Sequence, residues 1–578
     1  MLSLDHLNRL QAPEFVAALA SIFEHSPWVA ERVAASRPFA SGCALHQAMS
    51  AAVLGAGEDL QLALIRAHPE LAGRAAIRGD LTPASTREQQ GAGLKSLTAE
   101  QYARLHALNV EYGSRFGFPF VLAVKGHTPD SVIAELARRV THDRNTERGI
   151  ALREICRIAR FRLADTVDES LGGAIIGMAE ELAGLSEQAD ALTCSYLTPT
   201  HRATAARIRD FMLAAGLAAH IDAVGNVVGL LEGVDRGSRR LLTGSHYDTV
   251  INAGKYDGRL GVLLPIAVAG RLRRAGVRLA YPLEIIGFAE EEGVRFKSTF
   301  LGSRAVAGRF EGSLLDATDA DGISLRDAIH AAGHDVADIP AIARDPTQVR
   351  CFIEVHIEQG PVLLEAQRPV GVVTSIAGSL RSLVSVHGLS GHAGTVPMPL
   401  RHDAAVAAAE IVLAVERRCS ADPDLVGTVG RLDVPGGAVN VIPGRCDLSI
   451  DIRSGRDALR DAADADIAAA IAEIAARRGV TVDARRVLEA ASVPCTPVLQ
   501  DAWAASIERI TGERAPRLPS GAGHDAMMMA SLTDIGMLFV RCGNGGISHH
   551  PGETLSAGDA DVAARVFEDF LLHVEADA

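Results

Sequence analysis

An apolar run that ends in three consecutive carboxylates is the feature that most constrains this chain. Residues 281–289, YPLEIIGFA, have the length and composition of a buried strand, and Glu290, Glu291 and Glu292 follow directly. Carboxylates at the end of a buried strand are unfavourable unless a cation or a proton compensates them. Taken alone, a solvated acidic loop is the simpler explanation. Because neighbouring strand residues point to opposite sides, one carboxylate could hold a metal ion while the next faces a substrate.

Residues that could complete a metal site recur at the ends of other apolar segments. From about residue 190 onward helices and strands alternate, which predicts an α/β domain. His246 ends LLTGSH, Asp257 precedes a long apolar helix, His356 lies in CFIEVHIEQG and His549 lies in ISHHPGE. Loops at the strand ends of an open α/β sheet gather such ligands. With Glu292, the set suits two borderline divalent ions, although any one of these histidines alone is more often structural.

The composition indicates a multidomain protein that acts on small molecules. The chain has 578 residues, of which 48% are apolar, enough for several packed cores. Its 71 acidic and 57 basic residues give a net charge of −14, which argues against nucleic acid or a membrane surface as a partner. The 8 cysteines form no CxxC pair, and neither a secretory signal nor a membrane-spanning apolar run is visible. We therefore expect a cytoplasmic protein with reduced thiols.

The first 165 residues predict a compact helical bundle. Apolar residues recur at helical spacing in 15–24, 45–56, 58–70, 98–116, 129–140 and 146–165. Thr98 and Gln101 have the spacing of a capping box. His68 ends the third helix, because Pro69 disfavours helical geometry at the residue before it. A lone histidine there is usually structural, but the polar residues of LTPASTREQQGAGL can form a cluster that faces it.

Four motifs of this bundle resemble one enzyme family. HPELAG, STREQQGAGL, FPFVLAVKG and NTERGIALREICRIARFRL are similar, in this order, to 2-oxo-4-hydroxy-4-carboxy-5-ureidoimidazoline (OHCU) decarboxylase. The resemblance implies that His68 is the catalytic acid/base and that Glu88 orients it. The substrate contacts that it implies are Pro69, Ser85, Gln89, Phe120, Val121 and Arg162. Arg157 and Arg160 lie close to Arg162 in the sequence and are alternatives to it.

The resemblance implies decarboxylation of OHCU to S-allantoin without a cofactor. Loss of carbon dioxide leaves a carbanion that the ring delocalises, and a positioned imidazole then delivers a proton to one face. A docking or dimerisation module without activity is the alternative. The complete polar set of His, Ser, Glu and Gln argues against it.

The rest of the chain, over about residues 190–575, resembles the M20 family of binuclear metallohydrolases. GSHYDTV, EEEGVRF, HIEQGPVLL, GLSGHAGTVPM, GGAVNVIPG and SHHPGE are together similar to allantoate amidohydrolase and its close relatives. The metal ligands that the resemblance implies are Asp257, bridging two zinc or manganese ions, His246 and His356 on one ion, and Glu292 and His549 on the other.

Further site residues follow from the same resemblance. Glu291 would be the general base that activates the attacking water. His550 is an alternative to His549, but Ser548 and Glu553 align the family pattern on His549. Gln359, His524 and Asp525 are additional candidates for the substrate pocket, and a supporting role is equally compatible with the last two.

Between residues 377 and 493 the predicted order is strand, helix, strand, strand, helix, strand, which is typical of a ferredoxin-like domain. In the family this insert is the dimerisation or lid domain, so a homodimer through 377–493 is expected. It would bring His392, Asn440 and Arg453 to the substrate. His392 could donate to a developing oxyanion, and Arg453 could bind a carboxylate in a fork or pair instead with Asp451 or Asp447.

The expected fold is therefore multidomain. An all-α bundle occupies 1–168, an α/β M20-like catalytic domain occupies 169–376 and 494–578, and the ferredoxin-like α+β insert occupies 377–493. The expected function is bifunctional and uses small ureide substrates: OHCU decarboxylation, and hydrolysis of allantoate to ureidoglycine, ammonia and carbon dioxide. Because allantoin and allantoate are successive ureides, the two halves support each other, although the ring-opening step between them is missing.

Several alternatives remain for the second half. It could be an N-carbamoyl-L-amino acid hydrolase, a β-ureidopropionase or a ureidoglycolate amidohydrolase, and the residues that set pocket size are not visible in the sequence. A peptidase fits less well, because HIEQG and GGAVNVIPG have the carbamoyl-hydrolase form. A scaffold without activity would not need the complete ligand set and Glu291.

Overall fold

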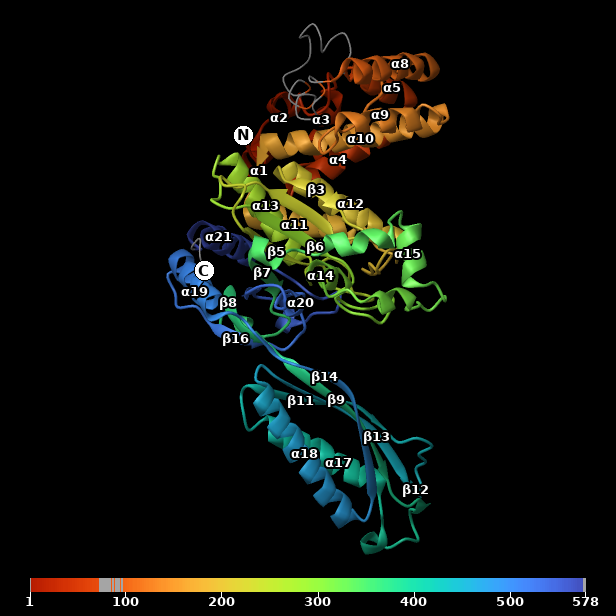
Figure 1. Cartoon of the computed structure of the whole chain (residues 1–578), viewed down its shortest axis with the longest axis vertical. Helices are drawn as coiled ribbons and strands as arrows, with labels where there is room; N and C mark the ends of the chain where they lie inside the picture. Colours follow the sequence, from red (N-terminus) through yellow and green to blue (C-terminus); the bar gives the residue numbers. More distant parts are fainter. Residues whose placement is uncertain (1, 72–84, 86–87, 89–93, 95–96, 575–578) are drawn as a thin grey trace. The chain divides into compact units, whose positions relative to one another are not determined.

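The structure is a computed structural model, and it describes residues 2–71, 85, 88, 94 and 97–574 (Figure 1). It divides into two compact units. Unit 1 comprises Met1–Arg350, Val355–Pro369 and Val540–Asp577, and unit 2 comprises Cys351–Glu354 and Val370–Phe539. Both predicted sets of catalytic residues lie in unit 1.

Unit 1 begins with the predicted helical bundle. Its helices are α1 (Leu4–Arg9), α2 (Ala12–Leu19), α3 (Trp28–Val33), η1 (Ala34–Ser36), α4 (Gly42–Leu54), α5 (Glu58–Ala67), α8 (Ala99–Phe116), α9 (Pro129–Arg139) and α10 (Arg144–Thr166). Strands β1 (Leu2–Ser3) and β2 (Val167–Asp168) pair in parallel. The capping box at Thr98 is confirmed, and His68 caps the end of α5 as predicted. Phe15, Leu45 and Tyr112 are among the fully buried side chains of its core.

A buried ion pair ties α9 to α10 inside this core. Arg139 and Glu147 are both 0% exposed, and the Arg139 guanidinium donates to Glu147 Oε1 from Nε at 2.8 Å and from Nη2 at 2.5 Å. The Tyr112 hydroxyl donates to the same oxygen at 2.5 Å. Arg139 Nη1 also donates to the carbonyl of Val121 at 2.9 Å. The pair therefore fixes a backbone segment that carries two predicted substrate contacts, Phe120 and Val121.

We predict that Arg139→Met destabilises the bundle by about 3–5 kcal/mol, because it leaves the Glu147 carboxylate buried without its cation. Hydrogen exchange of the α9 and α10 amides measures this loss. Arg138→Met on the same helix is the matched control. Arg138 pairs with Glu135 at the surface, so the expected cost is below about 1 kcal/mol. If Arg139→Met and Arg138→Met destabilised the bundle equally, the buried Arg139–Glu147 pair would not have the stabilising role given to it here.

The α/β part of unit 1 follows the bundle. Its elements are α11 (Leu171–Ala183), α12 (Pro199–Ala215), β3 (Ala218–Ile221), β4 (Val227–Leu231), β5 (Arg240–His246), α13 (Leu260–Arg274), β6 (Leu283–Phe288), α14 (Leu301–Val306), η2 (Gly312–Asp316), α15 (Leu325–Ala331), η3 (Val336–Ile342), η4 (Pro346–Gln348), β7 (Val349–Ile357), α16 (Val362–Glu365), η6 (Asn544–Gly546) and α21 (Ala557–His573). The strand order is β7-β5-β6-β4-β3, and the middle of β7, Cys351–Glu354, is counted with unit 2. Helix α11 packs against α13 and α21.

The register of two central strands brings the site together. β5 and β6 are parallel, and His246 at the end of β5 lies opposite Phe288 at the end of β6. Parallel strands end at the same edge of a sheet, so the Glu290–Glu292 segment begins beside His246. His356 lies near the end of β7, the other neighbour of β5 in the sheet. The ligands that are far apart in the sequence therefore meet at one edge.

Unit 2 contains a four-stranded antiparallel sheet and a smaller group of strands. Its elements are β8 (Val370–Ile376), β9 (Gly378–His387), β10 (Gly391–His392), η5 (Met398–Leu400), α17 (Ala404–Cys419), β11 (Leu425–Asp433), β12 (Val441–Ile442), β13 (Arg445–Ser454), α18 (Asp457–Arg478), β14 (Thr481–Ala490), β15 (Val493–Pro494), α19 (Pro497–Thr511), β16 (Arg517–Ser520), α20 (Ala526–Met529) and β17 (Ile535–Val540), whose last residue is in unit 1. β8 pairs with β15 and β16.

The four-stranded sheet has the order β11-β13-β9-β14. Along the chain its main elements alternate as β9, α17, β11, β13, α18 and β14, which is the predicted order. The side chains of β13 alternate between buried and partly exposed. Its buried side chains form one core with those of α17 and α18, which include Ala408, Ile411 and Ile467.

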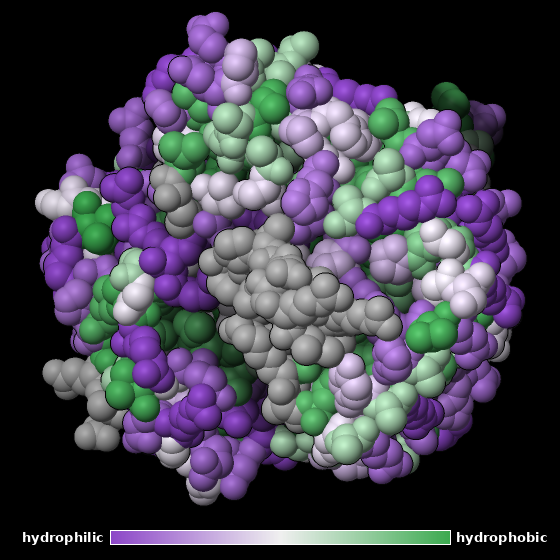
Figure 2. Space-filling model, turned by 90° about the horizontal axis from the view of Figure 1, so that it is seen from above, coloured by the Kyte–Doolittle hydropathy of each residue, from purple (hydrophilic) through white to green (hydrophobic). Residues whose placement is uncertain are grey.

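The molecular surface and the cysteines agree with the composition. Figure 2 shows a mostly hydrophilic face in which apolar side chains gather only in small separate patches. All 8 cysteines are free thiols. Among the described residues no single helix is long and apolar enough to cross a bilayer; α4 and α5 pass that test only as a pair bent by 115°.

Candidate active sites

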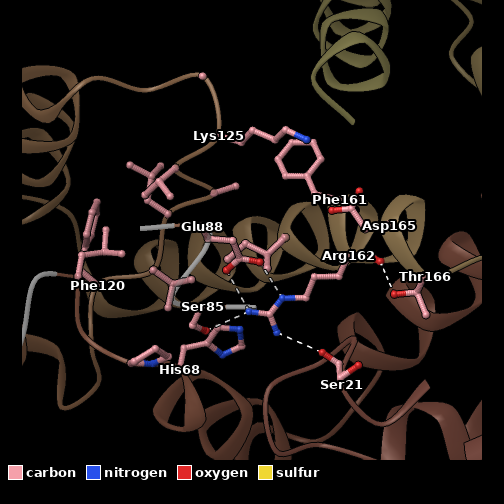
Figure 3. A pocket seen from close by; sticks show the side chains of 18 residues that line it. Ser21, His68, Ser85, Glu88, Phe120, Lys125, Phe161, Arg162, Asp165 and Thr166 are labelled. Carbon is pink, nitrogen blue, oxygen red and sulfur yellow. Dashed lines mark hydrogen bonds and ion pairs between the residues drawn. The ribbon is translucent and has the colours of Figure 1, made fainter. Parts of the chain in front are cut away.

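The first candidate site is a cavity of about 440 Å³ in the helical bundle (Figure 3). The predicted residues that line it are His68, Pro69, Ser85, Glu88, Phe120, Val121 and Arg162. Gln89 lies outside the described residues. The cavity also has a basic and an acidic side chain that were not predicted, Lys125 and Asp165. The structure thus gathers the predicted polar set around one space of small-molecule size.

His68 is fixed in one orientation by the backbone. Its Nδ1 donates to the carbonyl oxygen of Leu64 at 3.0 Å, and the side chain is 6% exposed. Burial lowers the pKa of His68 to about 4, and the nearby charge of Arg162 acts in the same direction. The imidazole is therefore neutral at pH 7, with the Nε2 lone pair available to accept a proton. The orientation that we expected from Glu88 comes instead from Leu64.

Arg162 is the arginine of α10 that faces the cavity. It forms a bidentate pair with Glu88, with Nε–Oε1 at 2.8 Å and Nη2–Oε2 at 3.0 Å. Arg157 pairs with Asp210 at 2.8 Å, and Arg160 pairs with Glu181 at 2.5 Å. The ambiguity among the three arginines arises because they are close in sequence, and helical geometry resolves it by pointing them to different partners.

The depressed pKa of His68 predicts an unusual pH profile for the first site. If the neutral imidazole is the active form, kcat/KM should stay level as pH falls from about 8 to about 5 and decline as pH approaches 4. Initial rates across this range, with circular dichroism to verify that the protein remains folded, test the prediction. A decline centred near pH 6.5, where an unperturbed histidine titrates, would contradict it.

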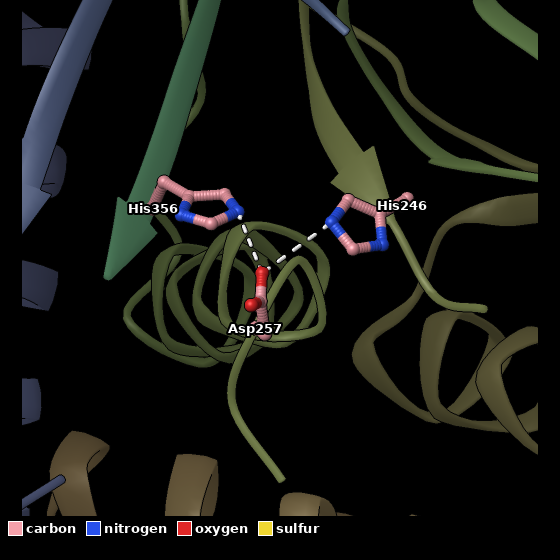
Figure 4. Close-up of side chains that lie close together, drawn as sticks. All are labelled: His246, Asp257 and His356. Atoms are coloured by element: carbon pink, nitrogen blue, oxygen red, sulfur yellow. Dashed lines mark ion pairs between the residues drawn. The ribbon is translucent and has the colours of Figure 1, made fainter. Parts of the chain in front are cut away.

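The second candidate site is a cluster at the carboxyl edge of β5, β6 and β7. Asp257 Oδ1 lies 3.6 Å from His246 Nε2 and 3.3 Å from His356 Nε2 (Figure 4). Its other oxygen, Oδ2, lies 3.2 Å from His549 Nε2, and His549 Nε2 lies 3.5 Å from Glu292 Oε1. Each carboxylate oxygen of Asp257 therefore faces a different set of nitrogen and oxygen donors. Asp257 could therefore serve as a ligand in both donor sets.

The two buried histidines present the same nitrogen to Asp257. His246 Nδ1 donates to the carbonyl of Asp248 at 3.1 Å, and His356 Nδ1 donates to the carbonyl of Ile357 at 2.8 Å. The Gly258 amide donates to His356 Nε2 at 3.2 Å, so that nitrogen presents its lone pair. Backbone acceptors commonly fix metal-binding histidines in this way. A Cβ at Gly258 would lie 2.4 Å from the His246 ring, so only glycine fits there.

The three consecutive glutamates do not alternate as strand residues would. β6 ends at Phe288, and Glu290 has a left-handed φ of 57°. Glu290 turns into the core, is 0% exposed, and burial raises its pKa to about 8. Glu291 and Glu292 both come within reach of His246. The assumed strand geometry was wrong because the chain leaves the strand before the first carboxylate, whereas the division of roles between Glu291 and Glu292 stays a prediction.

Asp248 holds this acidic loop and was missed in the sequence. Its two carboxylate oxygens accept the amides of Glu291 and Glu292, each at 3.2 Å. Asp248 is 1% exposed. It stands two residues after His246 in GSHYDTV, and that spacing was the available signal.

Ser548 and Glu553 hold Asp257 through its Oδ2 atom and its backbone amide. The Ser548 hydroxyl donates to Asp257 Oδ2 at 2.6 Å, and Glu553 Oε1 accepts the amides of Tyr256 and Asp257 at 2.7 and 3.2 Å. Gln359, predicted to contact substrate, donates to Asp257 Oδ2 at 2.8 Å. The alternative ligand His550 is exposed, as His549 is, but it belongs to none of the donor sets among the described residues and its Nδ1 accepts the Gly552 amide.

The electrostatics of the cluster fit divalent cations. Burial raises the pKa of Glu292 to about 7, and the bond to Asp257 raises that of His549 to about 8. Both raised pKa values mean that these groups hold a proton more readily than usual near pH 7. Exchange of such protons for a metal ion is the usual coupling in His and carboxylate sites. His246, Asp257 and His356 could hold one ion, and Asp257, Glu292 and His549 a second.

The remaining predicted residues belong to unit 2. His392 on β10 pairs with Val441 on β12, and the Asn440 carbonyl accepts the Ala393 amide at 2.9 Å. Arg453 forms a fork with Asp451 at 3.0 and 3.1 Å, the pairing that was its alternative role, and also donates to the Gly521 carbonyl. His524 Nε2 lies 2.7 Å from the Ser520 hydroxyl, and Asp525 is 0% exposed.

The geometry of the second site defines a class, the metal-dependent hydrolases, in which a cluster of histidines and carboxylates lies beside a further glutamate, Glu291. Residues 216–573 match the model of peptidase family M20/M25/M40, and residues 8–164 match that of OHCU decarboxylase. The chain therefore belongs to peptidase family M20/M25/M40 and carries a domain of the OHCU decarboxylase family at its N-terminal side. The predicted fusion is confirmed.

Individual relatives agree with this assignment. Allantoate deiminase of Arabidopsis thaliana is 40% identical over 421 residues, which are 68% of this chain and 80% of that protein. N-carbamoyl-L-amino acid amidohydrolase of Geobacillus stearothermophilus is 40% identical over 359 residues, 62% of this chain and 87% of that protein. The crystal structure of an amidase of the hydantoinase/carbamoylase family from Burkholderia multivorans is similar with a TM-score of 0.66 and 30% identity, covering 69% of this chain and 97% of that one.

Proposed function

We propose that the chain is a bifunctional enzyme of ureide breakdown. Its N-terminal domain decarboxylates OHCU to S-allantoin, and its M20 part hydrolyses allantoate to ureidoglycine, ammonia and carbon dioxide. One observation carries the proposal: the side chains expected for each reaction meet in two separate places within unit 1, around the bundle cavity and around Asp257. The family models and the allantoate deiminase relative support it.

In the decarboxylase site the protein supplies a neutral base in a partly apolar cavity. The His68 Nε2 lone pair can take a proton from the substrate, and the resulting imidazolium can return one to the carbanion left by carbon dioxide. Phe120 and Val121 lie along the cavity wall, where they exclude water from that carbanion. Arg162 is the fixed cation for a substrate carboxylate. These steps require no cofactor.

In the hydrolase site Glu291 is the proton carrier. When bound, divalent ions polarise the ureido carbonyl and lower the pKa of a water molecule. Glu291 is 8% exposed, and its Oε2 lies 4.0 Å from His246 Nε2, so it borders the cluster at which the attacking water would transfer a proton to a base. It takes the proton of that water and passes it to the leaving nitrogen. Asp248 fixes the backbone that carries Glu291.

The decarboxylase domain on the same chain favours allantoate over carbamoyl amino acids as the substrate, because its proposed product, allantoin, is also a ureide. An N-carbamoyl-L-amino acid hydrolase is the second candidate. The Geobacillus stearothermophilus relative supports it, because that enzyme and the Arabidopsis thaliana allantoate deiminase are both 40% identical to this chain. β-Ureidopropionase and ureidoglycolate amidohydrolase activities are further alternatives. The substrates differ in the group opposite the carbamoyl nitrogen, so direct comparison of rates discriminates among them.

The proposal includes three finer points. Two ions, zinc or manganese, occupy the cluster, because Asp257 offers one oxygen to each donor set. The 377–493 segment is a ferredoxin-like dimerisation domain that brings His392, Asn440 and Arg453 to the substrate, which its strand and helix order supports. The protein works in the cytoplasm, where its 8 free thiols remain reduced.

The test is ammonia release from allantoate by the manganese-loaded protein, with N-carbamoyl-L-amino acids and ureidoglycolate in parallel. The proposal predicts that allantoate is hydrolysed with the highest kcat/KM. If only carbamoyl amino acids were hydrolysed, the assignment of allantoate as the substrate would be wrong. Manganese and zinc are loaded separately, and the metal content is measured for each.

A further inference from the structure

The guanidinium of Arg162 has no N–H left for a substrate. It has five donors, one on Nε and two on each Nη. Besides its two bonds to Glu88, Arg162 donates from Nη1 to Glu24 Oε2 at 2.7 Å and to the Ser21 carbonyl at 3.3 Å. Its Nη2 also donates to the Ser85 hydroxyl at 3.2 Å. With the two bonds to Glu88, this makes five acceptors for five donors. A substrate group can reach Arg162 only by displacing one of them.

The charges around Arg162 also indicate that a substrate must displace one of its present partners. Two carboxylates, Glu24 and Glu88, share this one guanidinium. The proposed substrate brings a third carboxylate. Three carboxylates around one guanidinium in a largely buried place would repel one another, and Lys125, the other basic side chain of the cavity, interacts electrostatically with Glu88. One of the protein carboxylates must therefore leave when the substrate binds.

Exposure distinguishes the two carboxylates. The Glu24 side chain is 3% exposed and does not line the cavity, whereas that of Glu88 is 28% exposed and does. The Ser85 hydroxyl donates to Glu24 at 3.2 Å and adds to its fixation. Displacing a buried, hydrogen-bonded carboxylate is far more costly than displacing one at the cavity surface. Glu88 is thus the exchangeable partner and Glu24 the permanent one.

We propose that Glu24 is a positioning residue that anchors Arg162 from behind the cavity, and that the substrate carboxylate replaces Glu88 on the Nε–Nη2 edge of Arg162. The exchange conserves the charge around the guanidinium. It also releases Glu88 into the cavity, which His68 lines as well. The expected partnership of Glu88 with His68 would then belong to the substrate-bound state. This inference rests on the proposed decarboxylase function and adds to it Glu24 and the exchange.

Kinetics of Glu24 variants test the anchor. Glu24→Ala should raise KM for OHCU by about 10- to 100-fold, since it removes a charged hydrogen bond that aims Arg162, while kcat changes less. Glu24→Gln keeps an acceptor oxygen and should recover most of the lost affinity. Glu31→Ala, an exposed carboxylate of the same bundle, is the control and should leave KM unchanged. An unchanged KM in Glu24→Ala would overturn the anchor.

Ligand binding tests the exchange directly. The probes are hydantoin-5-acetate, a ring with a carboxylate, and allantoin, a ring without one, each titrated calorimetrically into the full chain. Glu88→Gln holds Arg162 less strongly, so hydantoin-5-acetate should bind more tightly than to the wild type, while allantoin binding stays the same. Weaker binding of hydantoin-5-acetate to Glu88→Gln would overturn the exchange. A wild type that neither decarboxylates OHCU nor binds either probe would instead refute the proposed function.

Discussion

Replacing Glu291 by glutamine should lower kcat for ureide hydrolysis by about 10²- to 10⁴-fold, the range that a positioned general acid–base contributes. The amide has nearly the same shape but cannot accept the proton of the attacking water. Glu291 shares a possible donor set with His246 and Glu292 but belongs to neither set that contains Asp257, so metal content should stay at the wild-type level. Rates are measured as ammonia release under saturating manganese.

The neighbouring carboxylate provides a matched control. Glu290→Gln changes the same chemical group one residue earlier, but Glu290 is buried, faces the core and has a pKa of about 8. It is therefore already protonated at pH 7, and its amide should change kcat by no more than a few-fold. If Glu290→Gln were as inactive as Glu291→Gln, the loss would reflect the shape of the loop and not proton transfer by Glu291.

Asp257→Asn should abolish hydrolysis and remove both metal ions, the second large effect. Asp257 is the one described residue whose two oxygens face both donor sets, and an amide offers one neutral oxygen where the carboxylate offers two charged ones. Metal analysis of the purified variant should give less than one ion per chain. Chelation of the wild type should reproduce the loss of activity, and added manganese should restore it.

Two histidine variants refine the metal count. His549→Ala removes a donor from the Glu292 side only, so one ion should remain on the side of His246 and His356. His550→Ala alters the exposed neighbour that is not in the cluster, and two ions should remain. If His549→Ala kept two ions per chain and His550→Ala kept only one, His550 and not His549 would be the metal ligand. The decarboxylase activity should be unaffected by all of these changes and by chelation.

Local rules explain why so much of this architecture follows from the sequence. Thr98 and Gln101 sit at the spacing of a capping box, and the cap is present. Pro69 ends α5 at His68 through a steric effect that involves only neighbours. His246 and His356 lie at the ends of apolar runs, and such runs become central strands whose ends meet at one edge. In each case the determining interaction is near in sequence or is set by sheet geometry.

What the sequence did not reveal depends on contacts between distant residues. Glu24 reaches Arg162 across 138 positions, and no local pattern marks it. Ser548 reaches Asp257 across 291 positions. The direction of Glu290 depends on a left-handed backbone that glutamate rarely adopts. The partner of Glu88 proved to be Arg162, because a buried guanidinium attracts a carboxylate more strongly than a neutral imidazole does.

The most direct test of the central claim is to measure both reactions in two single variants of the full chain, His68→Gln and Glu291→Gln. The account predicts that His68→Gln loses OHCU decarboxylation and keeps allantoate hydrolysis, and that Glu291→Gln shows the reverse. This outcome would establish two independent active sites on one chain. Loss of both activities in either variant, or a wild type that lacks one of the reactions, would contradict the bifunctional assignment.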